Sequence, residues 1–456
     1  MTILQYKKWR DFWGKLTSGS ANRQIFGATL IVAIGTALVK LAALAKELVV
    51  AWTFGTTDAF DAFLIALLIP SFIVNVVANS FNVALIPTYI KVREQEGIMV
   101  AQRLFSGATV WSLGLLGITT IAMIVTAPLY LPWIAGGFSP EKLDLTFKLL
   151  CAIAPMVLLS GMLTIWGAIL NAGERFALTA ISPIITPAIT IILLLLDNSW
   201  GVFALATGLV FGEILEIVIL GVTLKRQHIS LLPKWYGFDT NLREVANQYF
   251  PMIAGGFLMC SASLVDQAMA AQLSPGSVAA LNYGNRIIAL PITITTTALS
   301  TAVIPYFSKM VARADWTGIH HTLRRYLFLI FCITVPLAAL LYLGSEKIVE
   351  IMFQRGTFST KDTIMVAKIQ AFYALQIPFY VANILVVRLI SALQANHILM
   401  WGSAINLIVN IGLNYIFMKM LGISGIALST SCLYAICFSF TSYWCFYLLR
   451  SKNDQQ

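Results

Sequence analysis

The sequence is poor in charge. Charged residues make up 11% of its 456 residues, whereas an average soluble domain carries roughly 25%. Apolar residues reach 59% and the mean hydropathy is +0.83. So few charges cannot cover a water-exposed surface, and apolar runs of about 18 residues or more, long enough to cross the bilayer as helices, recur along the chain. The composition excludes a water-soluble protein and predicts an all-α polytopic membrane protein.

Histidine and cysteine are also scarce. The four histidines fall in predicted loops without metal-ligand spacing, and the six cysteines lie in apolar segments with no Cys-x-x-Cys pair. The phosphate-binding Walker A pattern is missing, because Gly14-Lys15 is followed by Leu16. We therefore expect no disulfide, no metal cluster, no cofactor, no ATP hydrolysis and no catalytic residues.

Apolar runs between polar gaps predict about twelve transmembrane helices. Their expected ranges are 24–53, 60–90, 105–135, 146–170, 176–196, 201–224, 245–271, 277–308, 322–343, 363–392, 398–418 and 423–448. Most of the 30 Lys and Arg residues fall at the termini and in the even-numbered gaps. The positive-inside rule then places both termini in the cytoplasm. In a membrane protein a net charge of +10 marks cytoplasmic loops, so we expect no nucleic-acid partner.

The longest predicted cytoplasmic gap divides the chain nearly in half. ALIPTYIK at 84–91 returns as AVIPYFSK at 302–309, and LNAGERF at 170–176 returns as LQANHIL at 393–399, at nearly the same offset. This repetition predicts two six-helix lobes around a central cavity. The expected parts are a cytoplasmic segment 1–23, an N-lobe 24–224, a linker 225–244, a C-lobe 245–448 and a cytoplasmic tail 449–456.

Basic residues inside the predicted spans are the first functional candidates. A charge at mid-membrane costs about 2.5–3.5 kcal/mol on insertion scales, so it needs a partner or a water-filled cavity. In helix one, Lys40 and Glu47 share a face and Lys46 points away from it. These residues either tie helices together or present positive charge to an anionic headgroup. In the second half, Arg286 lies about two turns below the outer end of its helix and suits a diphosphate. Arg388 lies only a turn from the inner end of its helix, where snorkelling explains it equally well.

Polar residues inside the spans point to ion coupling. Asp266 lies in the seventh helix, and Asn406 and Asn410 are four residues apart on one face of the eleventh. A carboxylate with amide oxygens could hold Na⁺ or position a proton, while hydrogen bonding between helices is the alternative. Glu213 and Glu216 share a face of the sixth helix and could carry a proton.

Several segments together resemble the MurJ/MviN family of lipid II flippases. They are FGTTDAFDAFLIALLIP, NSFNVALIPTYIK, ILNAGERFALTAISPII, LVDQAMAAQLSPGSVAALNYGNRIIALPI, ALSTAVIPYFSK, FQRGTFSTKDT and RLISALQANH, in the family's order. The resemblance implies the fold of the multidrug/oligosaccharidyl-lipid/polysaccharide exporters, with two lobes around a cationic cavity. It also implies flipping of undecaprenyl-diphosphate-linked sugars by alternating access in a bacterial cytoplasmic membrane.

The resemblance assigns substrate-binding roles to Lys40, Lys46, Asp61 and Arg286. For Asp61, an acid at a helix start, capping is the alternative. Two departures stand out. Val74 and Asn75 occupy positions where the family usually has an Arg-Arg pair, and the sequence stops after the twelfth helix, without the family's two further helices. Both departures favour a cargo other than lipid II itself.

The sequence thus predicts a flippase for an undecaprenyl-diphosphate-linked oligosaccharide, either lipid II or a related O-antigen, exopolysaccharide or peptidoglycan precursor. Its expected partners are that cargo, membrane lipids and glycan-assembly enzymes. The alternatives are a cation-coupled multidrug exporter of the same fold and a non-transporting scaffold for glycan assembly. An exporter of cationic drugs should have acids in its cavity, whereas Lys40, Lys46 and Arg286 favour an anion.

Overall fold

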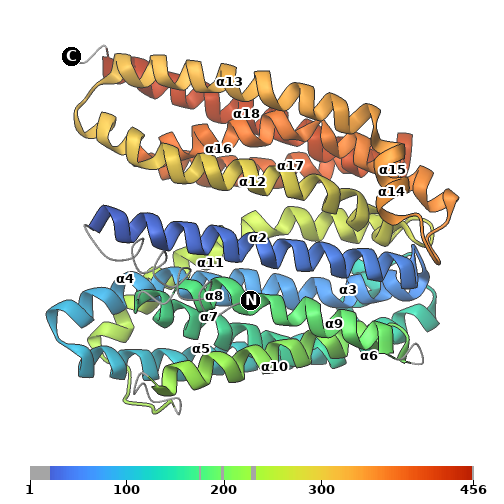
Figure 1. The fold of residues 1–456 in the computed structure, drawn as a ribbon, viewed down its shortest axis with the longest axis horizontal. Helices are drawn as coiled ribbons and strands as arrows, with labels where there is room; N and C mark the ends of the chain where they lie inside the picture. The colour runs from blue at the N-terminus through green and yellow to red at the C-terminus, as the bar shows by residue number, and fades with distance from the viewer. Residues whose placement is uncertain (1–20, 174–175, 197–199, 227–232, 454–456) are drawn as a thin grey trace, which may run out of the picture. The chain divides into compact units, whose positions relative to one another are not determined.

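The computed structural model describes residues 21–173, 176–196, 200–226 and 233–453. Over these ranges the chain is built of helices, with no strand among them, so the all-α prediction is confirmed. The first half contains α2 (Ala21–Phe54), α3 (Asp58–Ile73), η1 (Val74–Ala78), α4 (Asn79–Gln95), α5 (Ile98–Ile134), α6 (Pro140–Ile153), α7 (Pro155–Ala172), α8 (Phe176–Ile181), η2 (Ser182–Ile184), α9 (Ile185–Leu196) and α10 (Phe203–Arg226). The second half contains α11 (Thr240–Ala270), α12 (Ser277–Ala312), α13 (Trp316–Leu343), α14 (Ser345–Phe353), α15 (Thr360–Ala374), α16 (Gln376–Ala392), α17 (Asn396–Leu421) and α18 (Ile423–Asn453) (Figure 1).

Ten helical segments in the described ranges are long and apolar enough to cross a membrane. The helices α2 and α12 are not among the ten, although they have 34 and 36 residues, so the predicted total of twelve spans stays a prediction. The short helix α14 lies in a predicted outer gap, where it buries Val349 and Phe353 from one face. The predicted segment 1–23 falls largely outside the described residues.

The chain forms two compact units. One contains residues 1–50, 69–127 and 148–256, and the other contains 51–68, 128–147 and 257–456. These units cut across the predicted lobes, because 51–68 and 128–147 belong to the same unit as the second half of the chain. The division into two repeated six-helix lobes stays a prediction.

The first unit has an aromatic and aliphatic core. Phe81 of α4, Trp111 of α5 and Tyr249 of α11 pack with ring centroids 5.5–5.6 Å apart, and the Tyr249 hydroxyl donates to the carbonyl of Val77. Burying such rings removes a large apolar surface from solvent, so this core fixes the ends of α4, α5 and α11 together.

The second unit is built around α12, α15, α16 and α18. In Figure 1, α13, α16, α17 and α18 run side by side in yellow to red, and each contacts α16 or α18. Gly284 of α12 lets the helices approach closely, since an added Cβ would lie 2.7 Å from the side chain of Ile369 in α15. Ser359 and Asp362 form a capping box that starts α15.

Candidate functional site

The basic candidates of α2 are not equivalent. Glu47 is buried, and its Oε1 pairs with the Nζ of its neighbour Lys46 at 3.0 Å. Lys40 lies six residues earlier, and its side chain is exposed. The ion pair of α2 therefore joins Lys46 to Glu47, and Lys40 presents its charge at the helix surface.

The arginine candidates lie in the second unit. Arg286 of α12 is exposed, and its Nε donates to Asn282 Oδ1, one turn earlier, at 3.3 Å. This contact aligns the guanidinium along the helix. Arg388 is also exposed, one turn before α16 ends. Neither arginine is buried in its unit.

Asp61 lies in the first turn of α3, yet it caps another helix. Its side chain is 1% exposed, and its two oxygens accept the backbone N–H groups of Gly276 and Ala279 at 2.7 and 2.8 Å. Gly276 is the residue before α12, and Ala279 is in its first turn. The first N–H groups of a helix have no partner within it and carry partial positive charge, so a buried carboxylate here stabilises the start of α12.

Lys142 completes this network, and the sequence analysis missed its role. Its Nζ lies 3.1 Å from Asp61 Oδ2 and also pairs with Asp58, and the Lys142 side chain is only 9% exposed. The only sequence signal was a lysine in a short gap next to an apolar run. We call Asp58, Asp61, Lys142 and the start of α12 the Asp61 network.

The backbone beside the Asp61 network is tightly fitted. Gly276 has φ +83°, and an added Cβ would lie 2.5 Å from the carbonyl oxygen of Thr56. The Tyr283 hydroxyl donates to the carbonyl of Gly55 at 3.1 Å, and the Tyr283 ring stacks on Phe60 and packs against Phe353. The turn between α2 and α3 is therefore held to α12 by polar and aromatic contacts.

A second polar cluster surrounds Asp266 of α11. Its Oδ1 accepts the amide N–H groups of Asn410 at 3.0 Å and Asn414 at 2.6 Å, both on α17 and both buried. Asn406 is not in these contacts; its Oδ1 accepts the thiol of Cys437 instead. The structure thus brings Asp266 and Asn410 together, as the sequence predicted, and adds Asn414, which the sequence analysis missed.

The segment with Asn75 is irregular. Residues Val74–Ala78 form a π-helix between α3 and α4. The Asn75 amide donates to the Ser71 carbonyl at 2.9 Å, and its oxygen accepts from Asn79 at 3.1 Å. Single π-helical turns occur often at functional sites. No Arg-Arg pair stands at these positions, so this segment contributes amide groups rather than charge.

Ten helices in the described ranges are long and apolar enough to span a bilayer, and two of them enclose a buried carboxylate–amide cluster. These features define a multi-pass membrane protein. The comparisons with known proteins then identify its family. The sequence model described as "Lipid II flippase MurJ" matches residues 50–452. The chain therefore belongs to the lipid II flippase MurJ family.

Two relatives named "Probable lipid II flippase MurJ" illustrate the similarity. The protein from Synechocystis is 28% identical over 91% of this chain and 80% of its own length. The protein from Thermotoga maritima is 25% identical over 90% of this chain and 84% of its own length.

Solved structures show the same fold. A lipid II flippase MurJ in an inward closed conformation superimposes with a TM-score of 0.79 at 22% identity, covering 91% of this chain and 87% of that one. An inward-facing multidrug resistance transporter of the MATE family gives a TM-score of 0.76 at 13% identity, covering 94% of this chain and 99% of that one. The predicted fold is thereby confirmed.

Proposed function

We propose that this protein flips lipid II, an undecaprenyl-diphosphate-linked saccharide, across the bacterial inner membrane by alternating access. The observation that carries the proposal is membership of the lipid II flippase MurJ family over most of the chain. The two departures in the sequence favoured a related precursor over lipid II itself. Relatives named lipid II flippases, which align with 91% and 90% of this chain, favour lipid II as the cargo.

The exposed basic residues suit the diphosphate of such a lipid. A guanidinium pairs with two phosphate oxygens at once, and an ammonium adds a point charge. Lys40 and Arg286 have the exposure that anion binding needs, while Lys46 already pairs with Glu47. The work is done by binding and conformational change, so the proposed function needs no catalytic residue. Enzymes that make and use the lipid are the partners this function would bring close.

Binding by the purified protein tests the cargo. Native mass spectrometry should detect a lipid II complex that undecaprenyl diphosphate displaces and undecaprenol does not, because the alcohol lacks the anion. Binding of undecaprenol as strong as that of lipid II would contradict the role of the basic residues. Preference for a cationic drug over lipid II would favour the exporter alternative instead.

The proposed orientation has both termini in the cytoplasm. Asp239, just before α11, and Ser274, just before α12, are exposed and lie on opposite sides of one span. In a background without native cysteines, Asp239→Cys should be shielded from an impermeant thiol reagent in whole cells, and Ser274→Cys should be labelled. Labelling of the cysteine at Asp239 and protection of the one at Ser274 would invert the topology.

We propose further that the Asp266 cluster binds a monovalent cation, Na⁺ or H⁺, and couples its gradient to transport. A carboxylate and amide oxygens are the ligands hard cations prefer. The Asn414 Oδ1 is buried and has no hydrogen-bond partner among the described residues. Turning either amide would exchange its N–H donors for a carbonyl oxygen, which could face a cation at Asp266. Such binding shifts the conformation only if the two states differ in cation affinity.

Transport in vesicles with separate sodium and proton gradients tests this coupling. Asp266→Asn and Asn414→Ala should each abolish the response to the coupling ion, because they remove the anionic ligand and a neutral oxygen. Asn406→Ala is the matched control on the same helix and should keep the response. A normal response in Asp266→Asn would make the cluster structural.

A further inference from the structure

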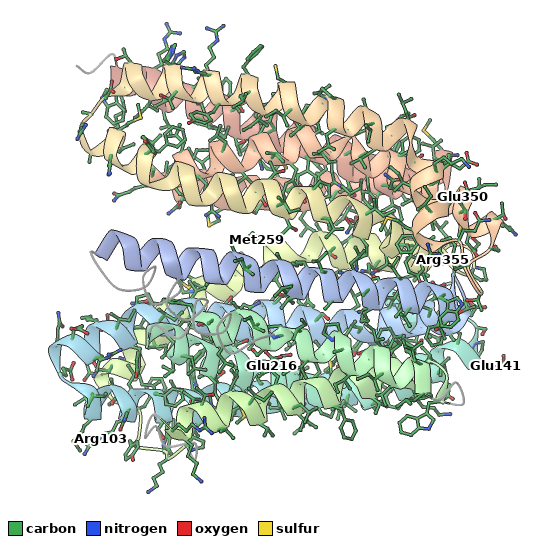
Figure 2. All side chains as sticks on the ribbon, viewed as in Figure 1. Arg103, Glu141, Glu216, Met259, Glu350 and Arg355 are labelled. Carbon is green, nitrogen blue, oxygen red and sulfur yellow. The ribbon has the colours of Figure 1, made fainter. Side chains whose placement is uncertain are left out.

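Helix α10 holds two buried carboxyl groups that the proposed transport cycle does not use. Glu213 and Glu216 are 8% and 7% exposed. Ser160 of α7 donates to Glu213 Oε1 at 2.6 Å, and Ser182 of η2 donates to Glu216 Oε1 at 2.6 Å. The other oxygen of Glu213, Oε2, is buried without a hydrogen-bond partner in the described structure. Figure 2 shows Glu216 inside the helices of its unit.

Glu216 adjoins a cavity that is lined by both apolar side chains and hydroxyl-bearing residues. It has a volume of about 300 Å³ and is lined by Glu216 and by the hydroxyls of Ser160, Thr164, Thr179 and Ser182. At roughly 30 Å³ per molecule, that is room for several waters, and four hydroxyls offer them partners. Ser160 lines the cavity and donates to Glu213, so it links the Glu213 carboxyl to the same space.

Irregular backbone forms two walls of this cavity. Val74 begins the π-helix η1, and Pro183 lies in the 3₁₀ turn η2, which separates α8 from α9. Non-helical backbone at membrane depth is tolerated where it is buried in protein or lines a water-filled cavity. Helix α10 also packs closely on α9, since a Cβ on Gly212 would lie 2.5 Å from the Thr186 Cα of α9.

The elements packed against this part of α10 offer little positive charge. No titratable side chain occurs in α7, α9 or η2, and the basic residues of α10 lie in its last turn. Helix α2 contacts α8 at Gly35. Among the residues of α2 whose side chains are described, the charged ones are exposed Lys40 and the ion pair of Lys46 with Glu47. Those of α4, α5 and α11 in this unit lie near helix ends and are Lys91, Arg93, Glu94, Arg103, Arg243 and Glu244.

Two carboxylates on one helix face, three residues apart, repel each other, and burying both as anions is expensive without a cation. The least costly way to keep both carboxyl groups buried is for them to bind a proton. We propose that Glu213 and Glu216 form a proton-binding site, with the hydroxyl-lined cavity as its path to water. The site is separate from the Asp266 cluster, which lies in the other compact unit. Loss of the proton favours a more hydrated cavity, so pH acts on the conformation around α10.

Infrared spectroscopy of the purified protein tests the proposal without any cargo. Between about pH 5 and about pH 9, the wild type should lose a carboxylic C=O band that shows slow hydrogen–deuterium exchange, as expected for a buried acid. Glu213→Gln/Glu216→Gln should lack that band, and each single variant should change it. Glu94→Gln, at an exposed acid of the same unit, should leave it unchanged. Glutamine replaces the protonated acid isosterically, so circular dichroism and thermal unfolding should show that the variants fold.

Two results would overturn the proposal. One is a band that persists in the folded double variant, which would assign it to other acids. The other is a band that disappears when Na⁺ is added at constant pH, which would make the carboxyls a metal-cation site. Because none of these readouts measures lipid II movement, the proton site and the flippase function can fail separately.

Discussion

Replacing Lys40 and Arg286 together by alanine should reduce lipid II translocation to the level of vesicles without protein. A hydrogen bond to a charged group contributes about 1.5–3 kcal/mol, so each single substitution should slow translocation about 10- to 100-fold. Both side chains are exposed, so their removal should leave folding and membrane insertion intact. Translocation of labelled lipid II in vesicles, normalised to inserted protein, measures the effect.

The matched control is Arg324→Ala, which removes an exposed positive charge near the start of α13. It should translocate at the wild-type rate. Charge-preserving variants separate charge from geometry: Lys40→Arg should retain most activity, whereas Arg286→Lys should lose part, since lysine cannot form a two-bond contact. Wild-type translocation by a well-inserted Lys40→Ala/Arg286→Ala variant would refute a diphosphate-binding role.

Removing the Asp61 carboxylate should have the second largest effect. Asp61→Ala leaves the start of α12 without its cap and the nearly buried Lys142 with only Asp58. Loss of a helix cap costs about 0.5–2 kcal/mol, and breaking a buried ion pair costs more. If transport requires the contact between the α2–α3 turn and α12 to open and close, Asp61→Ala should shift the conformational equilibrium toward the open form. Translocation should then fall about tenfold or more.

Spin labels at Thr57 and Pro275, both exposed beside the network, measure this shift. Their distance distribution should broaden to longer distances in Asp61→Ala. Asp58→Ala is the control: Asp58 binds the same lysine, but its side chain is 58% exposed, and exposed ion pairs contribute about 0–1 kcal/mol. An unchanged distribution and a wild-type rate in Asp61→Ala would mean that the network only stabilises the fold.

The fold was predictable because the spanning segments are surrounded by lipid rather than by water. Length and hydropathy identify helices such as α5 and α18, since each must satisfy its backbone hydrogen bonds internally. The π-helix at Val74–Ala78 has no such signal: its residues are as apolar as those of a regular helix, and its geometry depends on the packing around it. The cost of burying charge selected Lys40 and Arg286, whereas the structure leaves both side chains exposed. The same argument gave no partner for Asp61.

The partners depend on long-range contacts. Asp61 and Gly276 are 215 positions apart, so a single sequence contains no local pattern that joins them. The asparagines of α17 illustrate a smaller error. Asn406, Asn410 and Asn414 recur every four residues, and each step of four rotates the side chain by about 40° around the helix. This repeat of asparagines predicted that an asparagine faces Asp266, but the packing of α17 decides which two of the three do so.

Lipid II translocation in reconstituted vesicles tests the central claim most directly. Lipid II labelled on its sugar–peptide part would be monitored by a membrane-impermeant quencher while ion gradients are imposed. The account predicts protein-dependent movement of the label between leaflets, lost in the Lys40→Ala/Arg286→Ala variant and retained in Arg324→Ala. Tight lipid II binding with movement no faster than in protein-free vesicles would contradict a flippase and favour a scaffold for glycan assembly.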